Sequence, residues 1–219
     1  MIADYTVVRS SRKTIALVID SEANLIVRAP NNIKDSEIAD FVKKKRHWIN
    51  DKQYQVSTFA EKHSRVIFET GENFLYLGDE YTILRSKESK ICFSGTNILI
   101  PENFNLSDVL SWLKEVASNI INERVSRYSS LMGVTYSSIK LSKAKARWGS
   151  CSSKDSLNFA WRLIMCPISV IDYVVVHELS HITYKNHSAS FWSRVKTVLP
   201  NYKEQQDWLK LNRKLMEII

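Results

Sequence analysis

The chain has 219 residues, of which 44% are hydrophobic and 25% charged, and its formal net charge is +8, a composition typical of a soluble globular protein of one domain or two small ones. No apolar stretch reaches the ~20 residues that a membrane-spanning helix needs, and charged residues interrupt the N-terminal segment, so neither a membrane protein nor a signal peptide is predicted. The three unpatterned cysteines, Cys92, Cys151 and Cys166, indicate reduced thiols and a cytoplasmic location.

The part of the chain before Pro101 is predicted to be rich in β-strands and to contain one helix. Asp35 or Ser36 can cap that helix, which continues through Ile49. The composition changes after Pro101, so we expect a β-rich region at residues 1–101 and a second domain at residues 102–219. The strands are predicted from short apolar runs at residues 5–9, 14–19, 25–28, 66–68, 74–77, 81–84 and 98–100.

The part after Pro101 is predicted to begin with a long amphipathic helix that Ser107 caps. A β-hairpin follows, with a turn over residues 149–153 and a return strand over residues 157–164. Further helices are expected around residues 168–182, 191–198 and 208–215. The sequence therefore predicts an α+β fold, in which a β-rich N-terminal region is followed by a second domain of helices and strands.

The most informative segment is His177-Glu178-Leu179-Ser180-His181, which His187 follows. On a helix, His177 and His181 lie about 40° apart and about 6 Å apart along the axis, so both imidazoles can reach one metal ion. Glu178 lies about 60° from His181, close enough to act as a general base on a metal-bound water. Zinc with three protein ligands and one water is the usual catalytic arrangement, so this spacing predicts a zinc hydrolase.

His187 is the predicted third ligand, provided that the helix ends before it. On a continuous helix it would lie about 9 Å beyond His181 along the axis and out of reach. Lys185 and Asn186 suit a helix end, because lysine favours the C-terminus and asparagine adopts the left-handed conformation. A downstream glutamate such as Glu204 is the alternative third ligand.

A β-strand is the alternative for the segment that carries His177 and His181. The β-branched run over residues 168–176 favours a strand by local propensity, and the two histidines would then lie about 13 Å apart, too far to share a metal. Apolar residues continue to Ile182, however, and Pro167 stands where a helix can begin. We therefore expect a buried helix.

A basic segment without acids precedes this motif, and it consists of Lys140, Lys143, Lys145, Arg147 and Lys154. It is either a solvated face or a positive rim that attracts an acidic or nucleic-acid-associated partner. A metal-dependent hydrolase of nucleotides or other phosphoesters is thus an alternative to a peptidase, although the chain has no phosphate-binding glycine loop. A non-catalytic, zinc-stabilised interaction module is the second alternative, although structural zinc sites normally have four ligands.

These motifs resemble the YgjP-like metallopeptidases, predicted cytosolic zinc-dependent hydrolases allied to the SprT-like proteases. The resemblance covers residues 140–195 and implies one zinc ion per chain, with His177, His181 and His187 as ligands and Glu178 as general base. It implies a zincin-like catalytic domain over residues 102–219 and no cofactor other than zinc. It also implies a peptide or protein substrate that adds as an antiparallel strand beside residues 157–163. The motifs are Arg147-Trp148-Gly149-Ser150-Cys151, Asn158, Trp161-Arg162-Leu163, the segment 172–181, Asn186-His187 and Phe191-Trp192.

Arg147, Asn158, Arg162 and Tyr184 are candidates for contacts with the substrate or the transition state. Arg147 could polarise a substrate carbonyl or carboxylate, and it could equally be a surface residue of a turn. Tyr184 could donate to an oxyanion, and it stands where the metzincins, which share the three-histidine spacing, need a glycine. Cys151 is either a fourth zinc ligand or a small turn residue.

Overall fold

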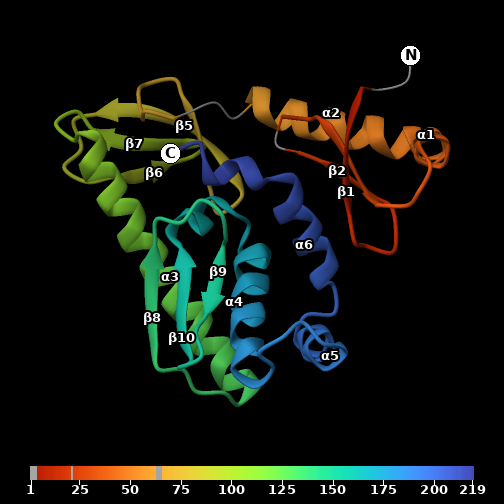
Figure 1. The fold of residues 1–219 in the computed structure, drawn as a ribbon. Coiled ribbons are helices and arrows are strands. Elements are labelled where there is room, and N and C mark those ends of the chain that lie inside the picture. The colour runs from red at the N-terminus through yellow and green to blue at the C-terminus, as the bar shows by residue number, and fades with distance from the viewer. Residues whose placement is uncertain (1–3, 21, 63–65) are drawn as a thin grey trace. The chain divides into compact units, whose positions relative to one another are not determined.

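The computed structural model describes residues 4–20, 22–62 and 66–219, except for the side chains of residues 59–62, and it has the predicted α+β fold (Figure 1). The chain forms two compact units, Met1–Ser64 with Leu211–Lys214, and Arg65–Lys210 with Leu215–Ile219. The change in composition after Pro101 falls inside the second unit, so packing divides the chain at a different place from the predicted domain boundary, which stays a prediction. No helix among the described residues has the length and apolarity needed to cross a membrane.

The first unit contains a three-stranded sheet and two helices. Strand β3 (Leu25–Pro30) lies in the centre, parallel to β1 (Tyr5–Ser10) and antiparallel to β2 (Ala16–Ile19). The expected single helix is two helices, α1 (Asp35–Lys44) and α2 (Arg46–Lys62), because Lys45 leaves the helical conformation and ends α1. The N-cap of α1 is Lys34 rather than Asp35 or Ser36. The core of the unit consists of Leu25, Val27, Ala29, Ile38, Val42 and Ile49.

The second unit begins with a four-stranded sheet in the order β4-β5-β7-β6. The strands β5 and β7 are parallel, and the other neighbours are antiparallel. The short strand β6 was not expected. The bounds are β4 (Asn73–Tyr76), β5 (Asp79–Ser86), β6 (Cys92–Ser94) and β7 (Asn97–Pro101).

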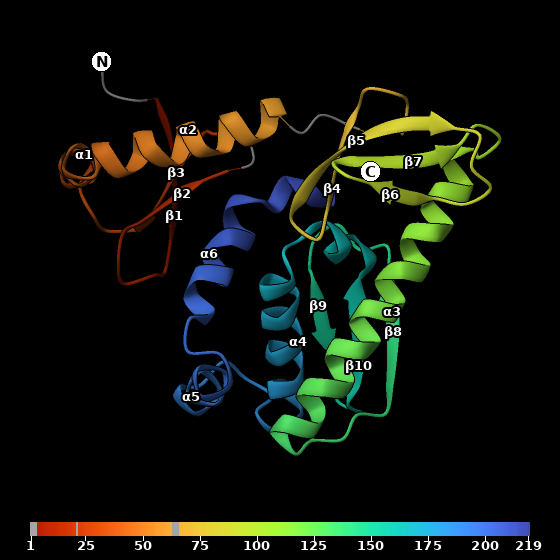
Figure 2. The ribbon, with the colours of Figure 1, turned by 180° about the vertical axis from the view of Figure 1, so that it is seen from behind.

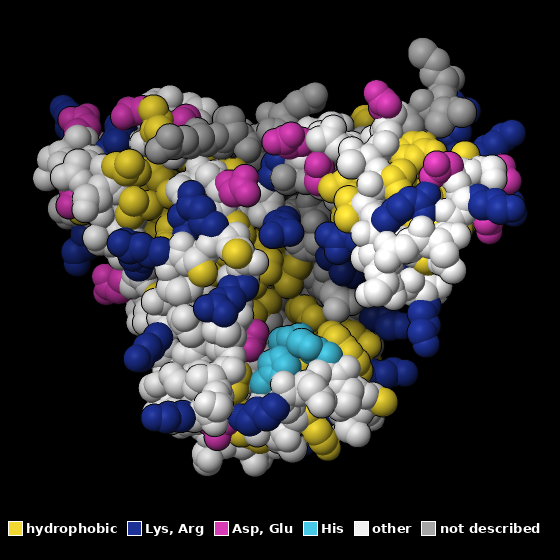
Figure 3. Space-filling model, viewed as in Figure 1, with side chains coloured by type: hydrophobic (Ala, Val, Ile, Leu, Met, Phe, Trp, Pro, Cys, Tyr) yellow, Lys and Arg dark blue, Asp and Glu magenta, His cyan; other side chains and the backbone are white. Residues whose placement is uncertain are grey.

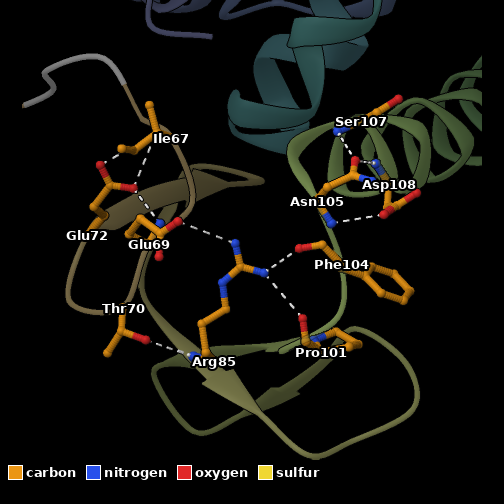
Figure 4. Close-up of polar contacts among 10 residues, drawn as sticks. All are labelled: Ile67, Glu69, Thr70, Glu72, Arg85, Pro101, Phe104, Asn105, Ser107 and Asp108. Atoms are coloured by element: carbon orange, nitrogen blue, oxygen red, sulfur yellow. Dashed lines mark hydrogen bonds and ion pairs between the residues drawn. The ribbon is translucent and has the colours of Figure 1, made fainter.

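The strand predicted at residues 66–68 is absent. The φ angle of Phe68 is +66°, which breaks an extended strand. The backbone N–H groups of Ile67 and Glu69 donate to the Glu72 carboxylate instead of to a neighbouring strand (Figure 4). A side chain therefore satisfies donors that a sheet would otherwise satisfy.

The turn between β4 and β5 contacts the segment that precedes the histidine-bearing helix. Leu77 and Gly78 form this two-residue turn, and both have positive φ, as a type I′ hairpin turn requires. The Leu77 N–H donates to Ile164 O at 2.7 Å. A Cβ atom on Gly78 would lie 2.7 Å from Pro167 Cγ, so only glycine allows this close approach.

Helix α3 (Leu106–Met132) follows the four-stranded sheet, and the Arg85 guanidinium bridges the connection by donating to Pro101 O and Phe104 O (Figure 4). The N-cap is Asn105 rather than the expected Ser107. The Asn105 side chain accepts from the N–H groups of Ser107 and Asp108. The buried face of α3 carries Val109, Leu113, Ala117, Ile121 and Val125.

A three-stranded sheet replaces the predicted hairpin. Its order is β8 (Ser138–Ser142), β10 (Ser156–Ala160) and β9 (Gly149–Cys151), with β10 parallel to β8 and antiparallel to β9. The hairpin prediction is wrong because the presumed turn contains a strand, β9, which pairs with the edge of β10 opposite to β8. As a result β8 and β10 are parallel and not antiparallel. The return strand also ends at Ala160, where the 3-10 helix η1 (Trp161–Met165) begins.

The position of β10 corrects the expected place of peptide addition. Both edges of β10 are already paired, so no further strand can join it. Helices α3 and α4 (Ile168–Thr183) lie on one face of this sheet (Figures 1 and 2). Two further helices, α5 (Ala189–Val198) and α6 (Tyr202–Leu211), follow, and the 3-10 helix η2 (Arg213–Met216) lies near the C-terminus.

Candidate metal centre

His177 and His181 lie on helix α4, and the strand alternative is therefore wrong. Every residue from Val170 to Val176 is buried. Burial on all sides explains why this β-branched run is helical, since tertiary packing outweighs the weak helix propensity of valine and isoleucine. Pro167 precedes the first turn, as expected.

The three histidines of the motif converge. One possible ligand atom from each of His177, His181 and His187 lies within 4.8 Å of the others; His187 is exposed and the other two are partly buried. Histidine side chains reach the surface on one face of the molecule (Figure 3). The Nε2 atoms of His177 and His187 are 3.0 Å apart. Two nitrogens that share a tetrahedral zinc ion at ~2.0–2.1 Å are about 3.3 Å apart, so this pair has about the spacing of two zinc ligands. Within the described residues, this group includes neither Glu204 nor Cys151.

His187 returns to the cluster by a different turn from the expected one. Helix α4 ends at Thr183, and Tyr184 is extended, with φ −123° and ψ 103°. Asn186 does not have a positive φ, so its expected left-handed role is wrong. Ser188 then caps α5 by accepting from the Phe191 N–H. His187 is thus held in the short connection between two capped helices.

An ion pair fixes this connection to the neighbouring sheet. Lys185 Nζ lies 2.6 Å from Asp155 Oδ1, and Asp155 belongs to the turn between β9 and β10. Lys185 therefore joins the connection after α4 to the turn between β9 and β10, in addition to being a cation near the end of a helix. The pair is partly exposed, so its contribution to stability is modest.

The orientation of the imidazoles is set by their neighbours. Tyr184 O lies 3.0 Å from His181 Nδ1, which leaves Nε2 of His181 as the nitrogen available to a metal. The Trp192 ring stacks on His187 with ring centroids 5.5 Å apart. The Phe191 ring packs against His181 with a centroid distance of 4.6 Å. These contacts restrict ring rotation before any ligand binds.

Burial and repulsion between the rings favour the neutral form of His177 and His181. Burial is the largest cause that lowers the pKa of His177 to about 3, and His181 and His187 lower it further. The pKa of His181 is also lowered, again mainly by burial. A neutral imidazole has the free lone pair that a metal needs. His177 and His181 therefore present the protonation state that binds metal ions.

Glu178 is buried beside this cluster, with 6% of its surface exposed. Burial raises the pKa of its carboxyl to about 7, although Arg147 and a hydrogen bond from the Cys151 N–H act in the opposite direction. A carboxyl group with a pKa near neutrality can both accept and release a proton. Such a group is suited to general acid–base chemistry.

The other candidate residues have different environments. Arg147 is exposed and close enough to Glu178 to act on its charge. Asn158 Oδ1, on β10, is buried without a hydrogen-bond partner among the described residues. The buried Arg162 donates to Ile219 O at 2.5 Å and to Lys143 O at 3.3 Å, so its donors serve the protein's own backbone. Tyr184 contributes its backbone oxygen to His181.

Sequence reasoning missed a buried ion pair that anchors α4. Arg124 on α3 donates to both oxygens of Asp172, at 2.5 and 2.6 Å, and the Tyr128 hydroxyl donates to the same carboxylate at 2.9 Å. Asp172 lies in the first half of α4, five positions before His177. The available signal was a carboxylate within the apolar run before His177, which requires a partner when it is buried.

A helix with the His-Glu-x-x-His motif and a third histidine folded back beside it defines the metallopeptidase class. Residues 13–212 match the model of the YgjP-like metallopeptidase domain, and the chain belongs to this family.

Two solved structures also resemble parts of the chain. The metallopeptidase zymogen of Pyrococcus abyssi abylysin is 20% identical, and the match covers 41% of this chain and 90% of that chain with a TM-score of 0.38. The metallopeptidase zymogen of Methanocaldococcus jannaschii jannalysin is 21% identical, with coverages of 43% and 96% and a TM-score of 0.38. No curated protein matches the chain significantly. The family supports a peptide or protein substrate and gives no support to a nucleic-acid partner or to phosphoester hydrolysis.

Proposed function

We propose that the chain is a zinc-dependent peptidase in which His177, His181 and His187 hold one zinc ion. The observation that carries this proposal is the convergence of three imidazoles beside a buried carboxylate of raised pKa. When bound, zinc supplies Lewis acidity, which polarises a substrate carbonyl and makes water more acidic. Three ligands leave a position open, as in catalytic rather than structural zinc sites.

Glu178 is the general base in this proposal. Its carboxylate takes a proton from the attacking water as the water oxygen bonds to the scissile carbonyl carbon. The same proton then passes from Glu178 to the departing amide nitrogen as the carbon–nitrogen bond breaks. A pKa near 7 suits both steps, because the proton is neither held too strongly nor released too early.

Strand β9 is the proposed docking edge for an extended peptide. It is an edge strand of its sheet and lies against α4, and Glu178 accepts a hydrogen bond from the backbone of Cys151 in this strand. A substrate strand on this edge would pass close to Glu178. Main-chain hydrogen bonds would then supply affinity with little dependence on substrate sequence.

The charges around the cluster favour acidic peptides. Residues 124–203 contain only three acids, Asp155, Asp172 and Glu178. Asp155 pairs with Lys185, and Asp172 pairs with Arg124. Among the described residues, no carboxylate lies within ion-pair distance of the basic segment defined by Lys140, Lys143, Lys145, Arg147 and Lys154. The uncompensated charge would attract substrates that carry Asp or Glu.

The experiment is to compare Glu178→Gln with the parent protein for zinc content and peptide cleavage. The variant should retain zinc and lose activity by about 10²–10⁴-fold, because it keeps the shape and removes the base. His187→Ala should lose zinc at submicromolar free metal, whereas Glu204→Ala should keep it. Unchanged cleavage by Glu178→Gln would assign the base to another group. A zinc-loaded parent that cleaves no peptide would favour the interaction module.

A further inference from the structure

Gly149 is the one glycine in the described structure whose backbone conformation does not call for glycine. The other four, Gly71, Gly78, Gly95 and Gly133, all have positive φ angles between 58° and 93°. Gly149 lies in strand β9, where L-amino acids are readily accommodated. A different reason is needed for glycine at this position.

The side chain of Glu178 supplies that reason. A Cβ atom on Gly149 would lie 2.7 Å from Glu178 Oε1, 2.8 Å from Cγ and 3.0 Å from Cδ. Ordinary carbon contacts are ~3.5–4.0 Å, so the two side chains cannot occupy this space together. All three nearest atoms belong to Glu178, and none belongs to a histidine.

The backbone of Cys151, two residues further along β9, holds the carboxylate of Glu178. Side chains alternate along a strand, so Gly149 and Cys151 share a face, and β9 lies against α4. The backbone N–H of Cys151 donates to the Glu178 carboxylate. The Glu178 side chain therefore lies along β9, over Gly149 and toward the Cys151 N–H.

We infer that Gly149 is a positioning residue, which leaves open the space that Glu178 needs to lie against β9. The inference rests on the proposed role of Glu178 as the base. The atoms that would clash form the movable end of a side chain, while α4 itself is anchored through Asp172 and Arg124. A larger residue at position 149 therefore relieves the clash by turning Glu178 away, not by moving the histidines.

The first test compares Gly149→Ala with the parent protein. We expect the same zinc content, a fall in kcat of about 10²-fold, and little change in KM, because misplacing a reacting group by about 1 Å has an effect of this size. Gly95→Ala is the matched control. Its φ is +58° and no atom lies within 4 Å of the new Cβ, so it strains the β6–β7 turn without touching the site. It should lower the melting temperature and keep kcat.

A double-mutant cycle separates positioning from general damage to β9. Alanine at position 178 has none of the three atoms that a Cβ on residue 149 would contact, so Glu178→Ala vacates the contested space and is itself slow. Adding Gly149→Ala to Glu178→Ala should lower the residual kcat by less than about threefold, against about 10²-fold in the parent. An equal loss in both backgrounds, or loss of zinc from Gly149→Ala, would overturn the inference.

A crystal structure of the metal-free Gly149→Ala protein decides the question without an activity assay. The inference requires the Glu178 carboxylate to have left the Cys151 N–H. A carboxylate that keeps this hydrogen bond in the variant would refute it. If the parent cleaves no peptide, the proposed function is wrong. The crystal structure of Gly149→Ala still tests whether Gly149 positions the Glu178 side chain.

Discussion

Glu178→Gln is expected to stabilise the metal-free protein at neutral and alkaline pH while abolishing its activity. Burial raises the pKa of the Glu178 carboxyl from 4.5 to about 7, so the folded chain binds this proton more tightly than the unfolded chain does. The stabilisation from this group is complete below pH 4.5 and is lost as the pH rises through 7. Glutamine has nearly the same shape and no charge, so the free energy of unfolding of the variant does not fall with pH for this reason.

The size of the effect follows from the same shift. The difference between 7 and 4.5 is 2.5 pKa units. At ~1.36 kcal/mol per unit, ionised Glu178 lowers the free energy of unfolding by about 3 kcal/mol. Because only 6% of Glu178 is exposed, solvent screening reduces this figure little. We therefore expect the variant to be more stable by about 2–3 kcal/mol at pH 8, and equal to the parent near pH 4.5.

The assay is urea unfolding of chelator-treated protein between pH 4.5 and 8. Glu204→Gln removes an exposed carboxylate and is the control, which should not reproduce the gain in stability because it removes no buried charge. Added zinc should narrow the gap between Glu178→Gln and the parent, because a nearby dication favours the ionised carboxylate. A gap that does not change with pH, or a variant less stable than the parent at pH 8, would refute the argument from burial.

Three further predictions concern other parts of the second unit. Arg124→Met leaves the Asp172 carboxylate buried without its ion pair and should cost about 3–5 kcal/mol in urea unfolding; a cost below about 1 kcal/mol would contradict the anchoring of α4. Chelation should abolish peptidase activity and preserve most of the helical circular dichroism, because α4 is buried by its own apolar residues; wholesale loss of ellipticity would contradict this. Lys143→Gln combined with Lys145→Gln, in the basic segment, should lower kcat/KM for acidic peptides several-fold and weaken the salt dependence of kcat/KM. Lys87→Gln combined with Lys90→Gln is the control pair, and an equal effect from it would count against charge attraction.

The sequence was sufficient to predict the histidine-bearing helix, because its evidence is local. The spacing of His177 and His181, the length of the apolar run and Pro167 all act within a few turns of one helix. The return of His187 could also be expected, since a continued helix would carry it away from the cluster. Its mechanism could not, because the extended conformation of Tyr184 depends on packing that the sequence does not display.

The sheet beside this helix could not be predicted, because strand pairing is decided over long separations. The small residues Gly149, Ser150 and Cys151 have the composition of a turn, yet they form β9 and pair with β10. Without β9, strand β8 was predicted to be the antiparallel hairpin partner of β10, whereas it is the parallel neighbour of β10. The same limitation hid the contact between Gly149 and Glu178, which joins residues that lie far apart in the chain.

The turn formed by Leu77 and Gly78 has a consequence for protein engineering. Two-residue hairpin turns usually tolerate extra residues or an inserted peptide, because they project into solvent. This turn instead abuts Pro167 and donates to Ile164 O, at the start of the helix that carries the histidines. Insertions here would push against α4, whereas the turn at Gly95 has open space beside it and is the better place for an epitope or a fluorescent label.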